Sequence, residues 1–523
     1  MKLKSITMIQ QFRQAVEEKE DEAAVINETE ALSWKDIDLT SDRLALGLLG
    51  ENISKGDHVA LWSFNSLAWI CAYIAIAKIG GVSVLVNPKL SAREADAMMS
   101  FADVDYICFG DDLYGKQADC LSGGYPGMSI GQEAWKQLRY LTPMNDAEKE
   151  ILKTREAAIS PHDMASMLFT SGSTSRPKGI LLTHYQLINV AREAVSCMHW
   201  TDQDKVCLAL PLFHSFGLST GLLSLFVHRG RLYVTPDCHS KTVMGVIDQY
   251  RCSVLNAVPS QFLAIVHHKE RKNFSLKSLR SGIIAGSSVF PNDYLKIAED
   301  LGIYHLKQSY GQTEASPSIT FSSYDDSLER CSKTVGKVIS NLQIRIISMA
   351  TGASLGANQP GRIEVNGYNV MQGYYKDEKE TANVLTEDGW LKTGDIGVLD
   401  LEGNLYIVGR IKEMIIRSGE NISPKEIEEV IIKHEGVVQV KVFGIPMSVV
   451  QEEIVACVEC PAGGVTIEAI RELIGDNLAP YKMPKVIKLY EKFPLNDSCK
   501  IDVKKMKEEI QLEMQEESLK NDF

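Results

Sequence analysis

Leu168-Phe-Thr-Ser-Gly-Ser-Thr-Ser-Arg-Pro-Lys-Gly179 is the most informative segment of the sequence, a run of small and hydroxyl side chains between two apolar stretches. Small residues let backbone amides approach an anion, and hydroxyl groups add hydrogen-bond donors. Lys178 adds a positive charge suited to the β- and γ-phosphates of a nucleotide. The spacing differs from that of the standard P-loop. A flexible linker is the alternative, but linkers rarely end in Pro-Lys-Gly, so the segment predicts a phosphate-binding loop.

The sequence around this loop alternates between strand and helix patterns. His58–Trp62 predicts a strand, Ser66 a helix cap, and Val82–Val86 a second strand, which together form a β-α-β unit. Similar apolar runs follow at residues 206–210, 231–235 and 254–258. Strands that alternate with helices are typical of an α/β fold, so we expect a large N-terminal domain of α/β subdomains.

The pattern changes after about residue 330, where short strands at residues 362–367 and 404–408 predict a smaller, turn-rich β unit. After Arg410 the sequence predicts a compact α+β domain. Its helices are expected at residues 424–434 and 466–478, and its strands at residues 437–443 and 453–458. The highly charged tail, residues 504–523, predicts a solvated helix. We therefore predict two domains, residues 1–409 and 410–523.

The composition limits the partners and the location of the protein. The chain has 523 residues, a formal net charge of -13 and 11 cysteines, which form no Cys/His cluster with the spacing of a zinc site. An acidic surface disfavours binding to nucleic acid or anionic membranes. The apolar run Leu67–Ile79 is too short to span a bilayer, and no secretory signal follows Met1. We expect a cytoplasmic location and no integral membrane segment.

The loop resembles the signature loop of the adenylate-forming (AMP-binding) superfamily, which includes acyl-CoA synthetases, peptide-synthetase adenylation domains and firefly-type luciferases. Ser175 stands where that family usually has glycine. The resemblance implies that the loop binds ATP through Thr170, Ser171, Gly172, Ser173, Thr174 and Lys178.

Further motifs follow in the order of that family. Pro211–Gly217 is similar to the segment in which His214 would line the acyl pocket, and Gly282–Ser288 to the loop in which Gly286 and Ser287 would border the adenine. The Tyr310–Glu314 motif is similar to the family's Tyr-Gly-x-Thr-Glu, with Gln312 at its variable position. The resemblance implies that Tyr310 packs on the adenine, that Thr313 contacts the α-phosphate, and that Glu314 with Thr170 holds Mg²⁺.

Motifs of the C-terminal part continue the resemblance. Asp395 and Arg410 match residues that contact the ribose, Lys412 matches the hinge position, and Ser418-Gly419 would approach the pantetheine arm of coenzyme A. Lys500 matches the catalytic lysine that bridges the carboxylate and the α-phosphate, although Cys499 replaces the family's glycine. Other departures from the family pattern are Met447, Gln451 and Arg362, the last interpreted as a surface change.

The combined motifs imply an AMP-forming acid–thiol ligase. It would activate a carboxylic acid as acyl-AMP with release of pyrophosphate, and then form acyl-CoA with release of AMP, using ATP, Mg²⁺ and coenzyme A. Loading of an acyl or peptidyl carrier protein is the main alternative. A luciferase-like oxygenase and a regulatory nucleotide-binding protein without turnover are weaker ones.

The acyl substrate is the least determined feature. Relatives that prefer acetate usually carry tryptophan at the position of Gly311, so glycine predicts open space in the acyl pocket. Each buried methylene contributes about 0.8 kcal/mol to binding, which favours a medium-chain, longer or aryl acid over acetate. This predicts a role in fatty-acid metabolism, with the choice between fatty and aryl acids open. The oligomeric state is also open, and a dimer is one option.

Overall fold

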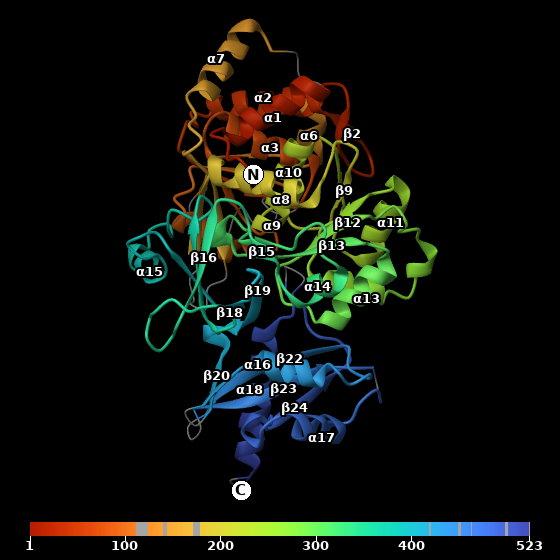
Figure 1. The fold of residues 1–523 in the computed structure, drawn as a ribbon. Coiled ribbons are helices and arrows are strands. Elements are labelled where there is room, and N and C mark those ends of the chain that lie inside the picture. The colour runs from red at the N-terminus through yellow and green to blue at the C-terminus, as the bar shows by residue number, and fades with distance from the viewer. Residues whose placement is uncertain are drawn as a thin grey trace. The chain divides into compact units, whose positions relative to one another are not determined.

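The computed structural model describes residues 1–110, 124–139, 144–170, 178–417, 420–447, 451–461, 463–496 and 500–521. The chain divides into two compact units: Met1–Ile344 with Val365–Leu391, and Arg345–Glu364 with Lys392–Phe523. Figure 1 labels the elements of both. The domain boundary between residues 409 and 410, and the hinge expected near it, stay predictions.

A six-stranded sheet in the first unit carries the ends of the predicted phosphate loop. Its order is β6-β5-β3-β4-β7-β8. Strands β3 to β7 run parallel, and β8 is antiparallel to β7. The strands are β3 His58–Trp62, β4 Val82–Leu85, β5 Tyr106–Phe109, β6 Gly127–Ser129, β7 Met164–Thr170 and β8 Lys178–Thr183.

A nine-stranded sheet in the same unit has the order β15-β14-β13-β12-β11-β9-β10-β1-β2. Its centre is parallel, and β2, β14 and β15 are antiparallel to their neighbours. The strands are β1 Ala23–Ile26, β2 Ala31–Ser33, β9 Lys205–Leu208, β10 Arg231–Val234, β11 Val254–Leu255, β12 Ser281–Ile284, β13 His305–Tyr310, β14 Thr320–Phe321 and β15 Lys337–Val338.

Helices cover both sheets and fill the space between them. The largest core joins α1, α2, α3, α8 and α10 to strands of both sheets, whereas α11 to α14 pack on the other face of the nine-stranded sheet (Figure 1). The helices of this unit are α1 Met8–Lys19, α2 Trp34–Gly50, α3 Leu67–Lys78, α4 Ala92–Phe101, α6 Gln132–Arg139, α7 Asp146–Ala157, α8 His184–Met198, α9 Ser215–Gly217, π-helix η2 Leu218–Leu223, α10 Ser224–His228, α11 Ser240–Tyr250, α12 Pro259–Val266, η3 Arg271–Asn273, α13 Pro291–Leu301, η4 Thr313–Ala315, α14 Leu328–Lys333 and α15 Glu378–Val384.

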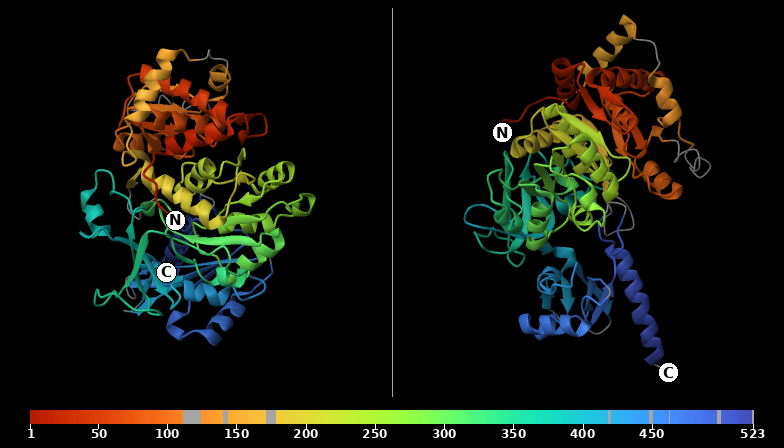
Figure 2. Two further views of the ribbon diagram at one scale, coloured as in Figure 1. Left: turned by 45° about the horizontal axis from the view of Figure 1, so that its top comes forward. Right: turned by 90° about the vertical axis from the view of Figure 1, so that its right-hand side faces the viewer.

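The second unit holds most of a four-stranded sheet, β16-β17-β18-β19, and all of a five-stranded sheet made of β21-β20-β23-β22 with β24 paired to β23. The last helix, α18, is dark blue in Figure 2 and packs Met506 and Ile510 on the five-stranded sheet. The elements are β16 Leu342–Ile347, β17 Gly361–Gly367, β18 Leu391–Leu399, β19 Leu405–Arg410, η5 Ile411–Glu413, β20 Ile415–Arg417, β21 Glu420–Ile422, α16 Pro424–Ile431, β22 Gln439–Met447, β23 Gln451–Glu459, α17 Ile467–Asn477, η6 Pro480–Lys482, β24 Val486–Tyr490 and α18 Val503–Asn521.

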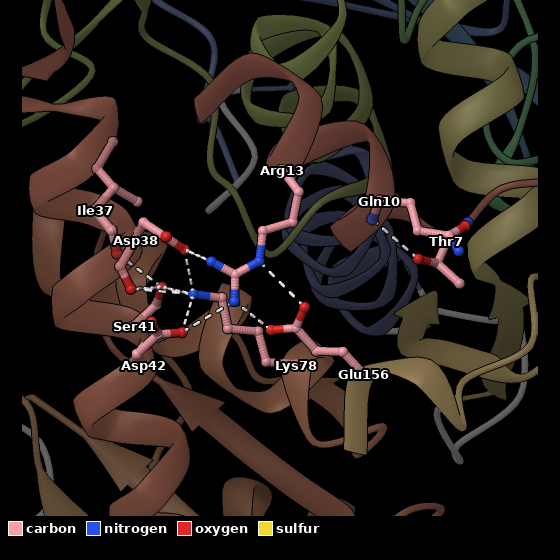
Figure 3. A network of polar contacts seen from close by, with 9 residues as sticks. All are labelled: Thr7, Gln10, Arg13, Ile37, Asp38, Ser41, Asp42, Lys78 and Glu156. Carbon is pink, nitrogen blue, oxygen red and sulfur yellow. Dashed lines mark hydrogen bonds and ion pairs between the residues drawn. The ribbon is translucent and has the colours of Figure 1, made fainter. Parts of the chain in front are cut away.

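A buried network of charged side chains joins α1, α2, α3 and α7 (Figure 3). Lys78, with 0% exposure, donates to Asp38 at 2.7 Å, to Ser41 at 2.8 Å and to Asp42 at 2.6 Å. Arg13 pairs with Asp38, Asp42 and Glu156. The network brings charge from four helices into one interior position, where each charge has a partner.

Lys307, on β13, is another fully buried lysine, and its Nζ donates to the backbone oxygen of Asp326 at 2.9 Å. Within the described part of the chain, no helix combines the length and the apolar character that crossing a membrane requires.

The α/β fold with a large N-terminal part and a small C-terminal part is confirmed. Ser66 caps α3 by accepting from the Trp69 backbone nitrogen at 3.0 Å, so the predicted β-α-β unit is β3-α3-β4. The run at residues 254–258 forms the two-residue strand β11 and a single bridge from Ala257 to Ile284, before Pro259 begins α12.

Candidate active site

The two ends of the predicted phosphate loop are paired to each other. Thr170, the last residue of β7, lies opposite Lys178, the first residue of β8, in the antiparallel ladder. Ser171, Gly172, Ser173, Thr174 and Ser175 lie outside the described residues. The strand pairing fixes Lys178 at the loop exit, where a nucleotide-binding lysine is expected.

Lys178 has a carboxylate partner and an aromatic neighbour. Its side chain, 14% exposed, forms an ion pair with Glu380 on α15. Its Nζ also lies 4.7 Å from the centre of the Tyr374 ring, within the range of a cation–π contact. Both partners, Glu380 and Tyr374, come much later in the sequence than Lys178. Neither was predicted from the sequence.

Tyr374 connects the lysine to the predicted magnesium ligand. Its hydroxyl donates to Glu314 Oε1 at 2.9 Å. Burial, with Glu314 close by, raises the pKa of Tyr374, so its hydroxyl stays protonated and remains a donor. Lys178, Tyr374 and Glu314 therefore form one continuous group in the first unit.

The Tyr310–Glu314 motif is placed by the end of strand β13. Tyr310 is the last residue of that strand, and Thr313 and Glu314 begin the short helix η4. The Thr313 hydroxyl lies 3.2 Å from the Ser215 hydroxyl on α9. A hydrogen bond thus joins the predicted acyl-pocket segment to Thr313, the predicted phosphate contact. Ser215 is a further residue that the sequence did not single out.

His214 comes directly before α9. Its ring centre is 4.3 Å from that of Phe213, and its backbone nitrogen donates to the Pro211 oxygen at 3.2 Å. The neighbouring Ser215 connects this segment to Thr313.

The prediction of open space beside Gly311 is wrong. A Cβ atom at this position would lie 1.7 Å from the Pro317 carbonyl oxygen and 2.9 Å from the Ser318 Cα. No side chain fits between these backbone atoms. Gly311 is therefore required by close backbone packing of the motif, and it does not report the size of the acyl pocket.

Gly286 and Ser287 lie beyond β12, the parallel neighbour of β13. Gly286 adopts a φ of +89°, in the left-handed region that favours glycine, and both residues are exposed. The carboxyl ends of β12 and β13 bring this turn and Tyr310 to the same edge of the sheet, the edge at which ligands bind in parallel sheets.

In the second unit, Asp395 and Arg410 are cross-strand partners on β18 and β19. Arg410 Nε donates to Asp395 Oδ1 at 3.0 Å. Asp395 is buried, whereas the Arg410 side chain is 60% exposed. The pair presents a fixed carboxylate and a largely solvated guanidinium, which suits recognition of ribose hydroxyls.

Lys412 lies in the exposed turn η5 that follows Arg410. Ser418, Gly419 and Cys499 are outside the described residues. The backbone nitrogen of Lys500 donates to Asn496 Oδ1 at 3.0 Å. Burial, and to a lesser degree Arg410, lower the pKa of Lys500.

Three departures from the family pattern have structural partners. Met447 and Gln451 pair with each other at the end of the β22–β23 hairpin. Arg362 is more than a surface change, because it donates to the buried carboxylate of Glu364 at 2.9 Å, and Arg345 binds the other oxygen of that carboxylate at 2.9 Å. Arg362 thus neutralises a buried charge.

Both the sequence and the fold match known proteins. The model of the AMP-binding enzyme family matches residues 12–375, and that of the AMP-binding enzyme C-terminal domain matches residues 426–500. The chain is 33% identical over 506 residues to "Putative acyl-CoA synthetase YngI" of Bacillus subtilis (strain 168), with 91% of each chain covered.

It is 29% identical over 519 residues to the mitochondrial medium-chain acyl-CoA ligase ACSF2 of Homo sapiens, covering 93% of this chain and 84% of the relative. The crystal structure of ATP-bound MatB from Rhodopseudomonas palustris has a TM-score of 0.83 at 24% identity, with 96% of this chain and 99% of that chain covered, and shares the fold. The chain belongs to the AMP-binding enzyme family, among the acyl-CoA synthetases and ligases.

Proposed function

We propose that the protein is an AMP-forming acyl-CoA ligase whose adenylation site is built around Lys178, Glu314 and Thr313. The observation that carries the proposal is the continuous group in the first unit. Tyr374 contacts both Lys178 at the loop exit and Glu314, and Thr313 lies next to Glu314 on the short helix η4. This arrangement supplies one cation, one carboxylate and one hydroxyl for a triphosphate.

ATP binding supplies the leaving group that a free carboxylate lacks. Attack of the substrate carboxylate on the α-phosphorus forms the acyl–AMP anhydride and breaks the bond to pyrophosphate. The barrier is mainly electrostatic, because two anions approach each other. In this proposal Lys178 neutralises the departing phosphates, Thr313 orients the α-phosphate, and Lys500 lies between the two reacting anions.

The residues present fit a magnesium ion that takes most of its ligands from phosphate. Among the described residues, no three His, Cys, Asp or Glu side chains form a metal-binding group. Mg²⁺ bound with nucleotides typically uses one or two protein ligands beside phosphate oxygens and water. Glu314 is the ligand that we propose, together with Thr170. A bound Mg²⁺ would neutralise phosphate charge.

The second step transfers the acyl group from AMP to the thiol of coenzyme A. We propose that residues 410–523 turn about Lys412 between the two steps, with Asp395 and Arg410 holding the ribose and with Ser418-Gly419 near pantetheine. The motif order of the family supports this step.

The acid that we propose is a medium-chain fatty acid. The support is the similarity to ACSF2, which is named a medium-chain acyl-CoA ligase. An aryl acid is the second candidate, since a CoA ligase for anthranilate shares the fold at a TM-score of 0.84. For the location we propose the cytoplasm, and cell fractionation tests it against the mitochondrial location of ACSF2.

The test is carboxylate-dependent pyrophosphate release with a panel of acids from acetate to long-chain and aryl acids. We expect release with medium-chain acids, and acyl-CoA only when coenzyme A is present. Lys500→Ala should abolish release, and thioester formation from supplied acyl-AMP should survive. Release without transfer to coenzyme A, but with transfer to a carrier protein, would establish the alternative function. No release with any acid contradicts the proposal.

A further inference from the structure

Glu380 places a carboxylate directly against Lys178, the lysine that the proposed function assigns to the phosphates. Glu380 Oε1 forms the ion pair with Lys178, while its Oε2 accepts from Asn383 Nδ2 at 3.0 Å. The Asp377 side chain caps the same helix by accepting from the Glu380 backbone nitrogen at 2.9 Å. Contacts with Asp377 and Asn383 therefore hold Glu380 in place on its own helix. Its carboxylate is not a loose surface group.

Backbone contacts hold α15 beside the exit of the phosphate loop. Tyr375 donates its backbone nitrogen to the Gly179 oxygen at 2.8 Å, and Tyr374 pairs with Ile180 in an antiparallel bridge. Tyr374 also donates its backbone nitrogen to Thr381 Oγ1 at 2.9 Å. These contacts tie strand β8 to the segment that begins α15, and they place Glu380 next to Lys178.

The proposed function requires Lys178 to neutralise the β- and γ-phosphates. A phosphate that binds Lys178 must either displace Glu380 or lie beside its negative charge, and both alternatives weaken binding. We propose that Glu380 is an internal competitor of the polyphosphate for Lys178, and that it weakens the binding of ATP and of pyrophosphate. The inference rests on the proposed function, since it assigns Lys178 to the phosphates.

The competition affects ATP and pyrophosphate but not AMP or acyl-AMP. AMP and acyl-AMP carry neither a β- nor a γ-phosphate, so Glu380 leaves their affinity unchanged. After the anhydride forms, the Glu380 carboxylate recovers Lys178 and favours the departure of pyrophosphate, while acyl-AMP stays bound. Glu380 therefore opposes the reverse reaction and sets the ATP concentration at which the site fills.

The experiment is calorimetric titration of the full chain with three probes at fixed ionic strength and Mg²⁺: α,β-methylene-ATP, pyrophosphate and AMP. Glu380→Gln keeps an oxygen for Asn383 and removes the charge. We expect it to bind the ATP analogue and pyrophosphate about threefold to tenfold more tightly, with AMP unchanged. Glu378→Gln removes a charge from the exposed face of the same helix and should change none of the three.

The double variant isolates the competition. In a Lys178→Met background, Glu380→Gln should lose its effect on the ATP analogue and on pyrophosphate. Unchanged or weaker polyphosphate binding by Glu380→Gln overturns the inference, and so does equal tightening for AMP or for Glu378→Gln. If Lys178→Met leaves binding of the ATP analogue unchanged, the assignment of Lys178 in the proposed function fails instead. Thermal melts of each variant check the fold.

Discussion

Gly311 shows how a single position can carry a motif without lining a pocket. Its Cα packs against the carbonyl of Pro317, and a Cβ atom would lie 1.7 Å from that oxygen. We expect Gly311→Ala to displace Thr313 and Glu314 together. Pyrophosphate release should fall by at least about tenfold, equivalent to about 1.4 kcal/mol, with every acid in the panel.

Gly50→Ala is the matched control for this prediction, because nothing lies within 4 Å of a Cβ atom there. It should leave activity at the wild-type level. If Gly311→Ala retained full activity, or changed only the order of preferred acids, the result would contradict the packing role. It would support the earlier interpretation that Gly311 lines the acyl pocket.

Lys500 provides a pH prediction. Burial and Arg410 lower the pKa of its ammonium group, so its positive charge is lost at a lower pH than that of an exposed lysine. Because the proposed adenylation step uses this charge, kcat/KM for pyrophosphate release should fall on the alkaline side below the ordinary lysine pKa. Lys500→Arg should move that decline to higher pH, since guanidinium stays charged. An unmoved alkaline limb would assign the decline to another group.

Roles for the motif residues could be proposed from the sequence, whereas their structural partners could not. A loop rich in small and hydroxyl residues with a terminal lysine indicates phosphate binding through local chemistry alone. Glu380 lies 202 residues from Lys178, and Tyr374 lies 60 residues from Glu314. Such pairs depend on how strands and loops assemble, and a single sequence holds no periodic signal for them.

The buried charge network belongs to the scale of elements, because Lys78 and Arg13 together join four helices (Figure 3). Lys78→Met leaves Asp38 and Asp42 buried, with only Arg13 to neutralise them. We expect the free energy of unfolding of the first unit to fall by about 3 kcal/mol. Denaturant unfolding measured by the fluorescence of the buried Trp34 and Trp69 would give this value.

The paired variant Lys78→Met/Asp42→Asn removes a cation and an anion together. It should be less destabilised than Lys78→Met alone, because fewer uncompensated charges remain buried. If the double variant were the less stable of the two, the network would contribute through packing and not through charge.

Element boundaries were predictable where local signals were strong. Strand β3 was predicted over the residues it occupies, and the Ser66 cap begins α3 as expected. The end of β11 was missed, because Asn256 uses its side chain to bind the Thr220 oxygen and the Ile283 backbone nitrogen. The apolar residues around it hide that role from a pattern based on hydrophobicity.

At the scale of the whole molecule, the proposed mechanism assigns a different arrangement of the chain to each half-reaction. Lys412 is the proposed pivot, in the turn η5 after Arg410. Lys412→Pro fixes φ near -65° and should prevent the pivot from adopting its second conformation. We expect pyrophosphate release to be largely retained and acyl-CoA formation to be lost, as measured by separate assays of the two steps.

Lys412→Ala controls for loss of the side chain and should support both steps. Equal loss of both steps in Lys412→Pro, with an unchanged melting curve, would assign η5 a structural role and remove the hinge from the mechanism.

The burial of Lys78 has an analytical use. An amine with no exposed surface reacts with acylating reagents only when the surrounding structure opens, so its labelling rate measures local opening. Lys307 offers a second such amine on the nine-stranded sheet, whereas Lys78 lies on a helix beside the six-stranded sheet. Timed acylation followed by peptide mass spectrometry would compare both lysines in one sample. Equal rates would mean that the two sheets open as a single cooperative unit, and unequal rates would identify the sheet that opens first.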